Sequence, residues 1–190
     1  PRFRIIVNKD KRYALENIAM GIETSNSIDD EDVIIVLDGD DWLSSSLVLS
    51  RLNAEYSDED CLMTYGSYIF YPWAFRGPEP SAYPEEVIKN NSFRDDDWRA
   101  SHLRTFKYKL WKNIDHKDLK DDDGNYYTMA YDQALMLPML EMASERSRYI
   151  WDIMHVYNKE NPISVDKIKA KQQAETAEEI RCKNPYKRLD

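Results

Sequence analysis

The sequence has few cysteines, no excess of basic residues and no long apolar run, and each shortage argues against a class of protein. Its two cysteines, Cys61 and Cys182, lack paired spacing, which argues against a disulfide framework or a zinc knuckle. The 26 basic residues stand against 35 acidic ones, and the net charge of −9 argues against nucleic acid and anionic membranes as partners. No stretch approaches about 18 apolar residues, so we expect no transmembrane segment. No signal peptide is visible, and a reducing, cytoplasmic location is expected.

The sequence does contain enough apolar residues for one folded domain. Its 190 residues are 42% hydrophobic and 12% aromatic, which predicts a packed core rather than disorder. Periodicity predicts a strand over 3–7, a helix over 15–22 and a strand over 33–37, which together form a βαβ unit of a parallel sheet. The later elements are expected as a helix over 47–56, a strand over 61–70, a mobile loop over 90–99, a helix over 131–144 with a kink at Pro138, a strand over 149–157, and a helix from Ser164 to about Cys182.

A run of carboxylates directly follows the apolar stretch 33–37. That stretch is expected to be a buried parallel strand covered on both faces, so residues 38–41, Asp-Gly-Asp-Asp, would lie at the edge where α/β sheets bind ligands. Neighbouring carboxylates repel one another unless a cation lies between them, and hard oxygen ligands select Mg²⁺ or Mn²⁺. Gly39 lets a ligand approach the backbone closely. The alternative is a solvated acidic turn, but the pattern favours metal-assisted handling of a phosphorylated substrate.

The same region resembles the family 2 glycosyltransferases of the GT-A fold. The resemblance is carried by Leu-Asp-Gly-Asp-Asp-Trp-Leu at 37–43 and by the helix Ala-Leu-Glu-Asn-Ile-Ala at 14–19, which follows an Asn-Lys turn. In that family an Asp-x-Asp element grips a metal ion and a nucleotide sugar. The resemblance therefore implies that Asp38 lies near the ribose and the donor sugar, that Asp40 and Asp38 bind Mn²⁺ or Mg²⁺, and that Asp41 supports this site.

The family has a second motif, an acidic residue at the start of a later helix. Here Ala-Tyr-Asp-Gln-Ala-Leu at 130–135 occupies that place, with Tyr131 where the family often has Glu. The resemblance implies that Asp132 is the general base of an inverting transfer, which deprotonates the acceptor hydroxyl as it attacks the anomeric carbon. The alternative is that Asp132 is only a helix N-terminal acid stabilised by the helix dipole.

Five further side chains are candidates for the donor, metal and acceptor sites. The imidazole of His102 could face the metal or the donor diphosphate, and Arg104 could pair with phosphate. His155 is a candidate metal ligand, with a core or rim histidine as the alternative. Trp42 and Trp98 are candidate acceptor contacts because aromatic faces suit sugar rings, although most aromatic side chains simply pack in the core or at its rim.

The resemblance covers about residues 5–158 and only the later half of the family pattern. The family normally opens with a strand, a helix and an Asp-Asp-x-Ser segment that cradles the nucleotide, whereas this sequence begins at Pro1 without them. We therefore expect an α/β, GT-A-like, mostly parallel sheet flanked by helices, which lacks the first nucleotide-binding strands. Such a sheet should have unpaired strand edges or a truncated nucleotide pocket, unless it is completed some other way. An N-terminally incomplete catalytic domain would span 1–163, and a C-terminal helix and tail 164–190.

The activity expected from this resemblance is metal-dependent transfer of a sugar from a nucleoside-diphosphate donor to a glycan or other hydroxyl acceptor, with inversion. A nucleotidyltransferase is one alternative, because it also uses paired acids and a metal on an α/β sheet; the Gly-rich basic loop it usually has near its start is not seen. A catalytically inactive fragment that binds glycans or partners is another. The donor sugar, the acceptor and the oligomeric state stay open.

Overall fold

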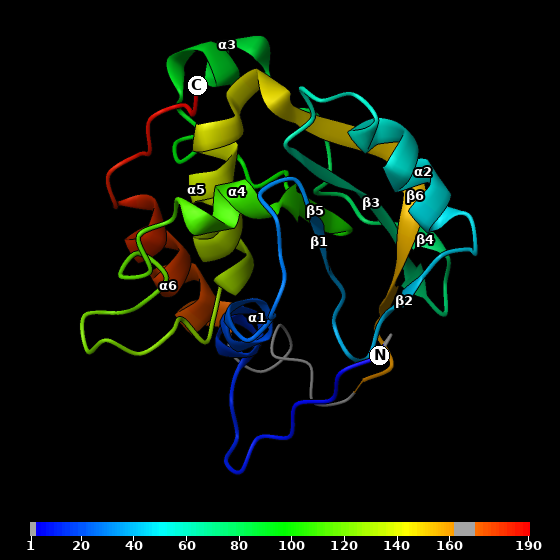
Figure 1. The fold of residues 1–190 in the computed structure, drawn as a ribbon, viewed down its shortest axis with the longest axis horizontal. Helices are drawn as coiled ribbons and strands as arrows, with labels where there is room; N and C mark the ends of the chain where they lie inside the picture. Colours follow the sequence, from blue (N-terminus) through cyan, green and yellow to red (C-terminus); the bar gives the residue numbers. More distant parts are fainter. Residues whose placement is uncertain (1–2, 162–169) are drawn as a thin grey trace.

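The computed structural model describes residues 3–161 and 170–190, which form an α/β fold around one curled mixed sheet (Figure 1). None of the helices in these ranges is long and apolar enough to cross a membrane. The elements follow one another in the order α1 (Ala14–Glu23), β1 (Val33–Val36), β2 (Trp42–Leu43), α2 (Val48–Tyr56), β3 (Met63–Tyr71), β4 (Phe75–Arg76), α3 (Glu85–Asn90), β5 (Arg104–Lys107), α4 (Tyr108–Lys112), α5 (Tyr131–Ala143), the 3₁₀ turn η1 (Ser144–Arg146), β6 (Ser147–Asn158) and α6 (Ala170–Arg181).

The sheet has the strand order β1-β5-β3-β6-β2, and β4 pairs with the second half of β3. Strands β3 and β6 run parallel along their whole length, with a register shift at Gly66 and Ser67. The other pairs, β1 with β5, β5 with β3, β3 with β4 and β2 with β6, are antiparallel. The predicted α/β class is therefore confirmed, but the prediction of a mostly parallel sheet is wrong.

Strand β1 is an edge strand and not the buried central strand that its apolar sequence predicts. It pairs with β5 on one side, and no other described strand pairs with it. Val33 is 36% exposed and only Val36 is fully buried. Residues 3–7 are exposed and form no strand, so the predicted βαβ unit is absent. The expectation of an unpaired strand edge is confirmed, and this edge opens onto a groove of about 340 Å³ beside α1.

Hydrophobic side chains fill both faces of the sheet. The larger cluster joins α1, α4 and α5 to one face, and every residue of α5 from Ala134 to Ala143 is buried. The smaller cluster joins Val48 and Leu52 of α2 to Ile150 and Met154 of β6. Figure 1 shows α2 and α5 on different sides of the central strands. The apolar sequence of α5 has no polar stripe because the helix is covered all round.

The segment 90–99 is packed against the protein, in contrast to the predicted mobile loop. Phe93 is fully buried, and Arg94 forms a buried ion pair with Glu141 of α5, at 2.6 Å between Nε and Oε1. Arg94 also donates a hydrogen bond to the carbonyl of Ile180 at the end of α6. The charged composition therefore marks an internal ion pair as well as a solvated surface. The predicted start of the last helix at Ser164 and the domain boundary after 163 lie outside the described residues.

Candidate functional site

The three carboxylates of the turn between β1 and β2 point to three different partners. The turn is closed by a hydrogen bond from the Asp41 amide to the Asp38 carbonyl, 3.1 Å. Asp38 accepts hydrogen bonds from Tyr131 at the start of α5. Asp40 is exposed and accepts a hydrogen bond from Asn161, 2.6 Å. Asp41 faces His155 of β6. The carboxylates are therefore separated by their partners and not held together around one point.

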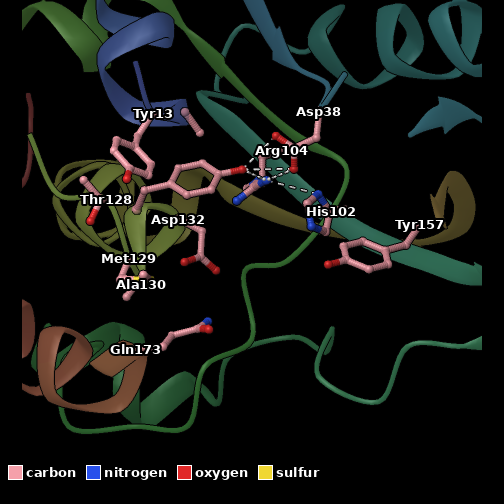
Figure 2. Close-up of a pocket in the computed structure, with 12 residues that line it drawn as sticks. Tyr13, Asp38, His102, Arg104, Thr128, Met129, Ala130, Asp132, Tyr157 and Gln173 are labelled. Carbon is pink, nitrogen blue, oxygen red and sulfur yellow. Dashed lines mark hydrogen bonds and ion pairs between the residues drawn. The ribbon is translucent and has the colours of Figure 1, made fainter. Parts of the chain in front are cut away.

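Asp38 lines a pocket of about 230 Å³ between the strand ends and the N-terminus of α5. His102 and Arg104, from β5 and the residues before it, form part of its wall, and Asp132 forms another part. Figure 2 shows the Asp132 carboxylate pointing into the space between Arg104 and Gln173 of α6. The two motifs that the resemblance links, the acidic turn and the helix start at Asp132, thus meet in one pocket.

A hydrogen-bonded network around Arg104 connects the walls of this pocket. The Tyr131 hydroxyl donates to Asp38 Oδ1 at 2.8 Å, and Arg104 Nη2 donates to the same hydroxyl at 3.0 Å and to Asp38 Oδ2 at 3.4 Å. Arg104 is 1% exposed. Its burial disfavours the charged form, but Tyr131, Asp38 and Asp132 together raise the pKa of the guanidinium above its ordinary value. Arg104 is therefore a permanently charged cation in the pocket wall.

Asp132 lies in the first turn of α5, where the chain turns sharply into the helix. Ala130, which directly precedes the helix, has a left-handed backbone with φ of +46°, an unfavourable conformation for a residue with a Cβ. This turn directs the first helical residues toward the pocket. Burial raises the pKa of Asp132, while Arg104 and the backbone N–H groups of the helix start oppose the shift. A carboxylate with a raised pKa is a stronger base than an ordinary aspartate.

Two buried imidazoles and one carboxylate gather next to this pocket. The rings of His102 and His155 stack with centroids 4.4 Å apart and an interplanar angle of 21°. His155 Nε2 and Asp41 Oδ2 are 2.8 Å apart, and Asp41 also accepts a hydrogen bond from the Asn158 amide. Burial lowers the pKa of His102 well below its ordinary value, and Arg104 and His155 lower it further, so His102 is neutral at pH 7.

This arrangement tests the metal ligands that the resemblance implies. In the part of the chain that the structure describes, the group of His, Cys, Asp and Glu side chains with donor atoms within 4.8 Å of one another is Asp41, His102 and His155. Asp38 and Asp40 do not belong to it. Of the expected ligands Asp38, Asp40 and His155, only His155 therefore lies where oxygen and nitrogen donors converge.

The structure places the other candidate residues away from the pocket wall. Gly39 lies in the exposed turn, with no atom within 4 Å of the position that a Cβ would take. Trp42 is 40% exposed and stacks edge-on against Tyr71 with ring centroids 5.2 Å apart. Trp98 is partly buried against the larger hydrophobic cluster. Neither tryptophan lines the pocket with Asp38 and Asp132.

Several residues of the pocket carry no sequence signal that identifies them. The wall also includes Tyr13 before α1, residues 128–130 before α5, and Gln173 on α6. Their types are common, and only the fold brings them together. Tyr131 differs, because its place beside Asp132 in the second motif is a sequence signal, although the prediction gave Tyr131 no role of its own.

Comparison of the sequence with models of known protein families gives no match, and comparison with curated proteins gives none. The geometry of the pocket and the resemblance carried by residues 37–43 and 130–135 are therefore the grounds for a proposed function.

Proposed function

We propose that this chain transfers a sugar from a nucleoside-diphosphate donor to a hydroxyl acceptor with inversion of the anomeric carbon. The observation that carries the proposal is the meeting of Asp38 and Asp132 in one pocket beside the buried cation of Arg104. A family 2 glycosyltransferase requires this combination: one acid at the donor, a second acid as base, and positive charge near the leaving diphosphate. The two acids come from segments far apart in the chain, and the fold brings them into one pocket.

In this proposal Asp132 removes the proton of the acceptor hydroxyl as the oxygen attacks the anomeric carbon. Its carboxylate points into the pocket, and its pKa is raised by burial, which increases its strength as a base. Tyr131 holds Asp38 and Arg104 together. Asp38 would accept hydrogen bonds from donor hydroxyl groups, and Arg104 would offset the charge that develops on the leaving diphosphate.

The family implies a divalent metal ion, and the residues present fit one. Asp41, His102 and His155 supply one oxygen and two nitrogen donors next to the pocket. When bound, such an ion would neutralise the charge of the leaving diphosphate. The Asp38 and Asp40 carboxylates do not converge in the way that the Asp-x-Asp expectation requires.

The size of the pocket limits what it encloses. Pockets that bury drug-sized ligands usually have about 300 to 1,000 Å³, whereas this one has about 230 Å³. The pocket suits a sugar ring and part of the diphosphate better than a complete nucleotide sugar. The proposal therefore places the nucleoside toward the open edge of β1, outside the pocket, and predicts that the sugar and diphosphate contribute most of the contacts with this chain.

The test is release of nucleoside diphosphate from a panel of uridine, guanosine and thymidine diphosphate sugars, with Mn²⁺ and simple sugar acceptors. One donor should react faster with the protein than without it. Asp132→Asn should lose about 10²- to 10⁴-fold in rate, which general base catalysis typically contributes, and keep its affinity for the donor. The control is Asp152→Asn, because Asp152 is an exposed acid paired with Arg51, away from the pocket.

Three outcomes would contradict the proposal. Full turnover by Asp132→Asn would show that Asp132 is not the general base. Release of pyrophosphate from nucleoside triphosphates, without reaction of the diphosphate sugars, would indicate a nucleotidyltransferase. Binding of glycans in the absence of metal, with no turnover of any donor, would indicate a binding module.

A further inference from the structure

We infer that Asp41, His102 and His155 form the divalent metal site of this chain, and that the site prefers Co²⁺ or Zn²⁺ to Mg²⁺. This assignment differs from the Asp38 and Asp40 pair that the sequence motif predicts. A role of the ion in turnover rests on the proposed function. The binding of the ion to these three side chains does not depend on that function.

The first support is convergence from three separate parts of the chain. Asp41 comes from the turn between β1 and β2, His102 from the residues before β5, and His155 from β6. One donor atom of each lies within 4.8 Å of the others. The exposed fractions are 2% for the Asp41 side chain and 0% for that of His155, and His102 as a residue is 9% exposed. Polar groups at this depth are rarely assembled without a partner that compensates for their loss of water.

The second support is a buried nitrogen that has no partner. His155 Nδ1 is buried and forms no hydrogen bond with the described residues, while its Nε2 faces Asp41 Oδ2 at 2.8 Å. A carboxylate only accepts hydrogen bonds, so Nε2 carries the proton and Nδ1 keeps a lone pair. An ion held by both Asp41 and Nε2 would take the place of this proton, and the unpartnered Nδ1 is the position on the ring that can receive it.

The donor set determines which ions bind. Imidazole nitrogen suits Zn²⁺, Co²⁺ and related ions, whereas Mg²⁺ prefers oxygen and keeps much of its water. Two imidazoles and one carboxylate leave coordination positions open for other ligands, such as diphosphate oxygens. The exposed Asp40, bonded to Asn161, lies outside the cluster and is not needed as a ligand.

A competing hydrogen bond sets a limit on affinity. Arg104 Nη2 lies 3.1 Å from His102 Nδ1, and arginine only donates, so Nδ1 is the acceptor. A neutral imidazole has one lone pair, and a metal at His102 must therefore displace this bond. Arg104 retains Tyr131 and Asp38 as partners when it does. The site should therefore bind metal reversibly, and not as tightly as a closed structural zinc site.

The test on the unmodified chain uses its three histidines. We expect Zn²⁺, added without nucleotide, to shift the imidazole ¹⁵N resonances of His102 and His155 in a long-range ¹H–¹⁵N NMR spectrum. His116, which pairs with Glu23 on the surface, should keep its position and serves as the internal control. Shifts of His116 alone, or no shift of any imidazole at millimolar Zn²⁺, would overturn the inference.

Calorimetric titration of the full chain then ranks the ions and the ligands. Co²⁺ and Zn²⁺ should bind at least about tenfold more tightly than Mg²⁺. Loss of outer-shell partners already costs about 10- to 100-fold in metal affinity, so His102→Gln and His155→Gln should each lose at least tenfold. Variants that do not melt cooperatively are set aside, because the NMR result on the unmodified chain decides alone.

Two further variants separate this site from the one that the motif predicts. His116→Gln and Asp40→Asn should both bind Co²⁺ within about twofold of the unmodified chain. If Asp40→Asn abolishes binding while His155→Gln does not, the ion is held by the Asp-x-Asp carboxylates and the assignment is refuted. Metal binding without turnover of any sugar donor would leave this inference standing and remove the proposed function.

Discussion

The hydroxyl of Tyr131 is the contact that joins the acidic turn to the helix carrying Asp132. It donates to Asp38 at 2.8 Å and accepts from Arg104 at 3.0 Å. Tyr131→Phe removes both hydrogen bonds and keeps the ring, which packs against the larger hydrophobic cluster. The substitution should therefore destabilise the protein and weaken the donor site without unfolding it.

The magnitude follows from the burial of the two partners. A hydrogen bond to a charged group contributes about 1.5 to 3 kcal/mol. The Asp38 side chain is 27% exposed, so water can replace the lost donor, whereas the Arg104 side chain is 2% exposed and loses an acceptor that water cannot easily replace. We therefore expect the free energy of unfolding to fall by the contribution of one such hydrogen bond, about 1.5 to 3 kcal/mol. At about 2 to 4 °C per kcal/mol for a domain of this size, Tm should fall by about 3 to 12 °C.

The assay is thermal unfolding followed by circular dichroism, with Tyr108→Phe as the matched control. Tyr108 is also partly buried against the larger cluster, and its hydroxyl forms no hydrogen bond among the described residues. If Tyr131→Phe melts within about 1 °C of Tyr108→Phe, the network does not stabilise the pocket. Affinity for the donor that the panel identifies should fall in parallel, because Asp38 loses the group that orients it.

Three further outcomes follow from buried charge. Folding raises the pKa of Asp132, so the stability that this group contributes falls as the pH rises from its unfolded pKa toward its folded pKa. At pH 7 the Tm of Asp132→Asn should therefore equal or exceed that of the unmodified chain, and the difference in Tm should shrink toward pH 4. The acidic limb of kcat/KM for sugar transfer should lie above the ordinary aspartate pKa of about 3.9. Glu141→Gln should lower the free energy of unfolding in urea by about 3 to 5 kcal/mol, because it leaves the Arg94 cation buried without a carboxylate partner. The double variant Arg94→Met/Glu141→Met should approach the stability of the unmodified chain. Equal losses in the single and the double variant would refute this interpretation of the ion pair.

The elements with strong local patterns could be predicted from the sequence. Helix α5 runs over Tyr131–Ala143, within a residue of the prediction, because a mostly apolar segment of that length favours a helix over a strand. Strand β3 at Met63–Tyr71 and strand β6 at Ser147–Asn158 were also found, since β-branched and aromatic residues dominate both. These elements form the centre of the sheet, where local preference and tertiary environment agree.

The position of β1 in the sheet could not be predicted in the same way. The five apolar residues 33–37 are typical of a strand buried on both faces, but burial depends on which chain segments lie beside the strand. Among the described strands only β5 pairs with β1, and Val33 and Leu37 remain 36% and 42% exposed. The composition of a strand reports what it is suited to contact, and the direction of its neighbours is decided by connections that lie far along the chain.

The same distinction between local pattern and tertiary environment applies to the site. Asp38 and Asp132 were predicted to work together because each lies in a recognisable motif, and the pocket brings them together. The group around Asp41 depends on long-range register instead. Leu43 and Tyr68 both lie opposite His155, and a register shift between β3 and β6 at residues 66–67 sets which residues face one another. A shift of one residue in that register would turn His155 to the other face of the sheet and separate it from Asp41. The proposed metal site is therefore a property of strand pairing, which no local motif encodes.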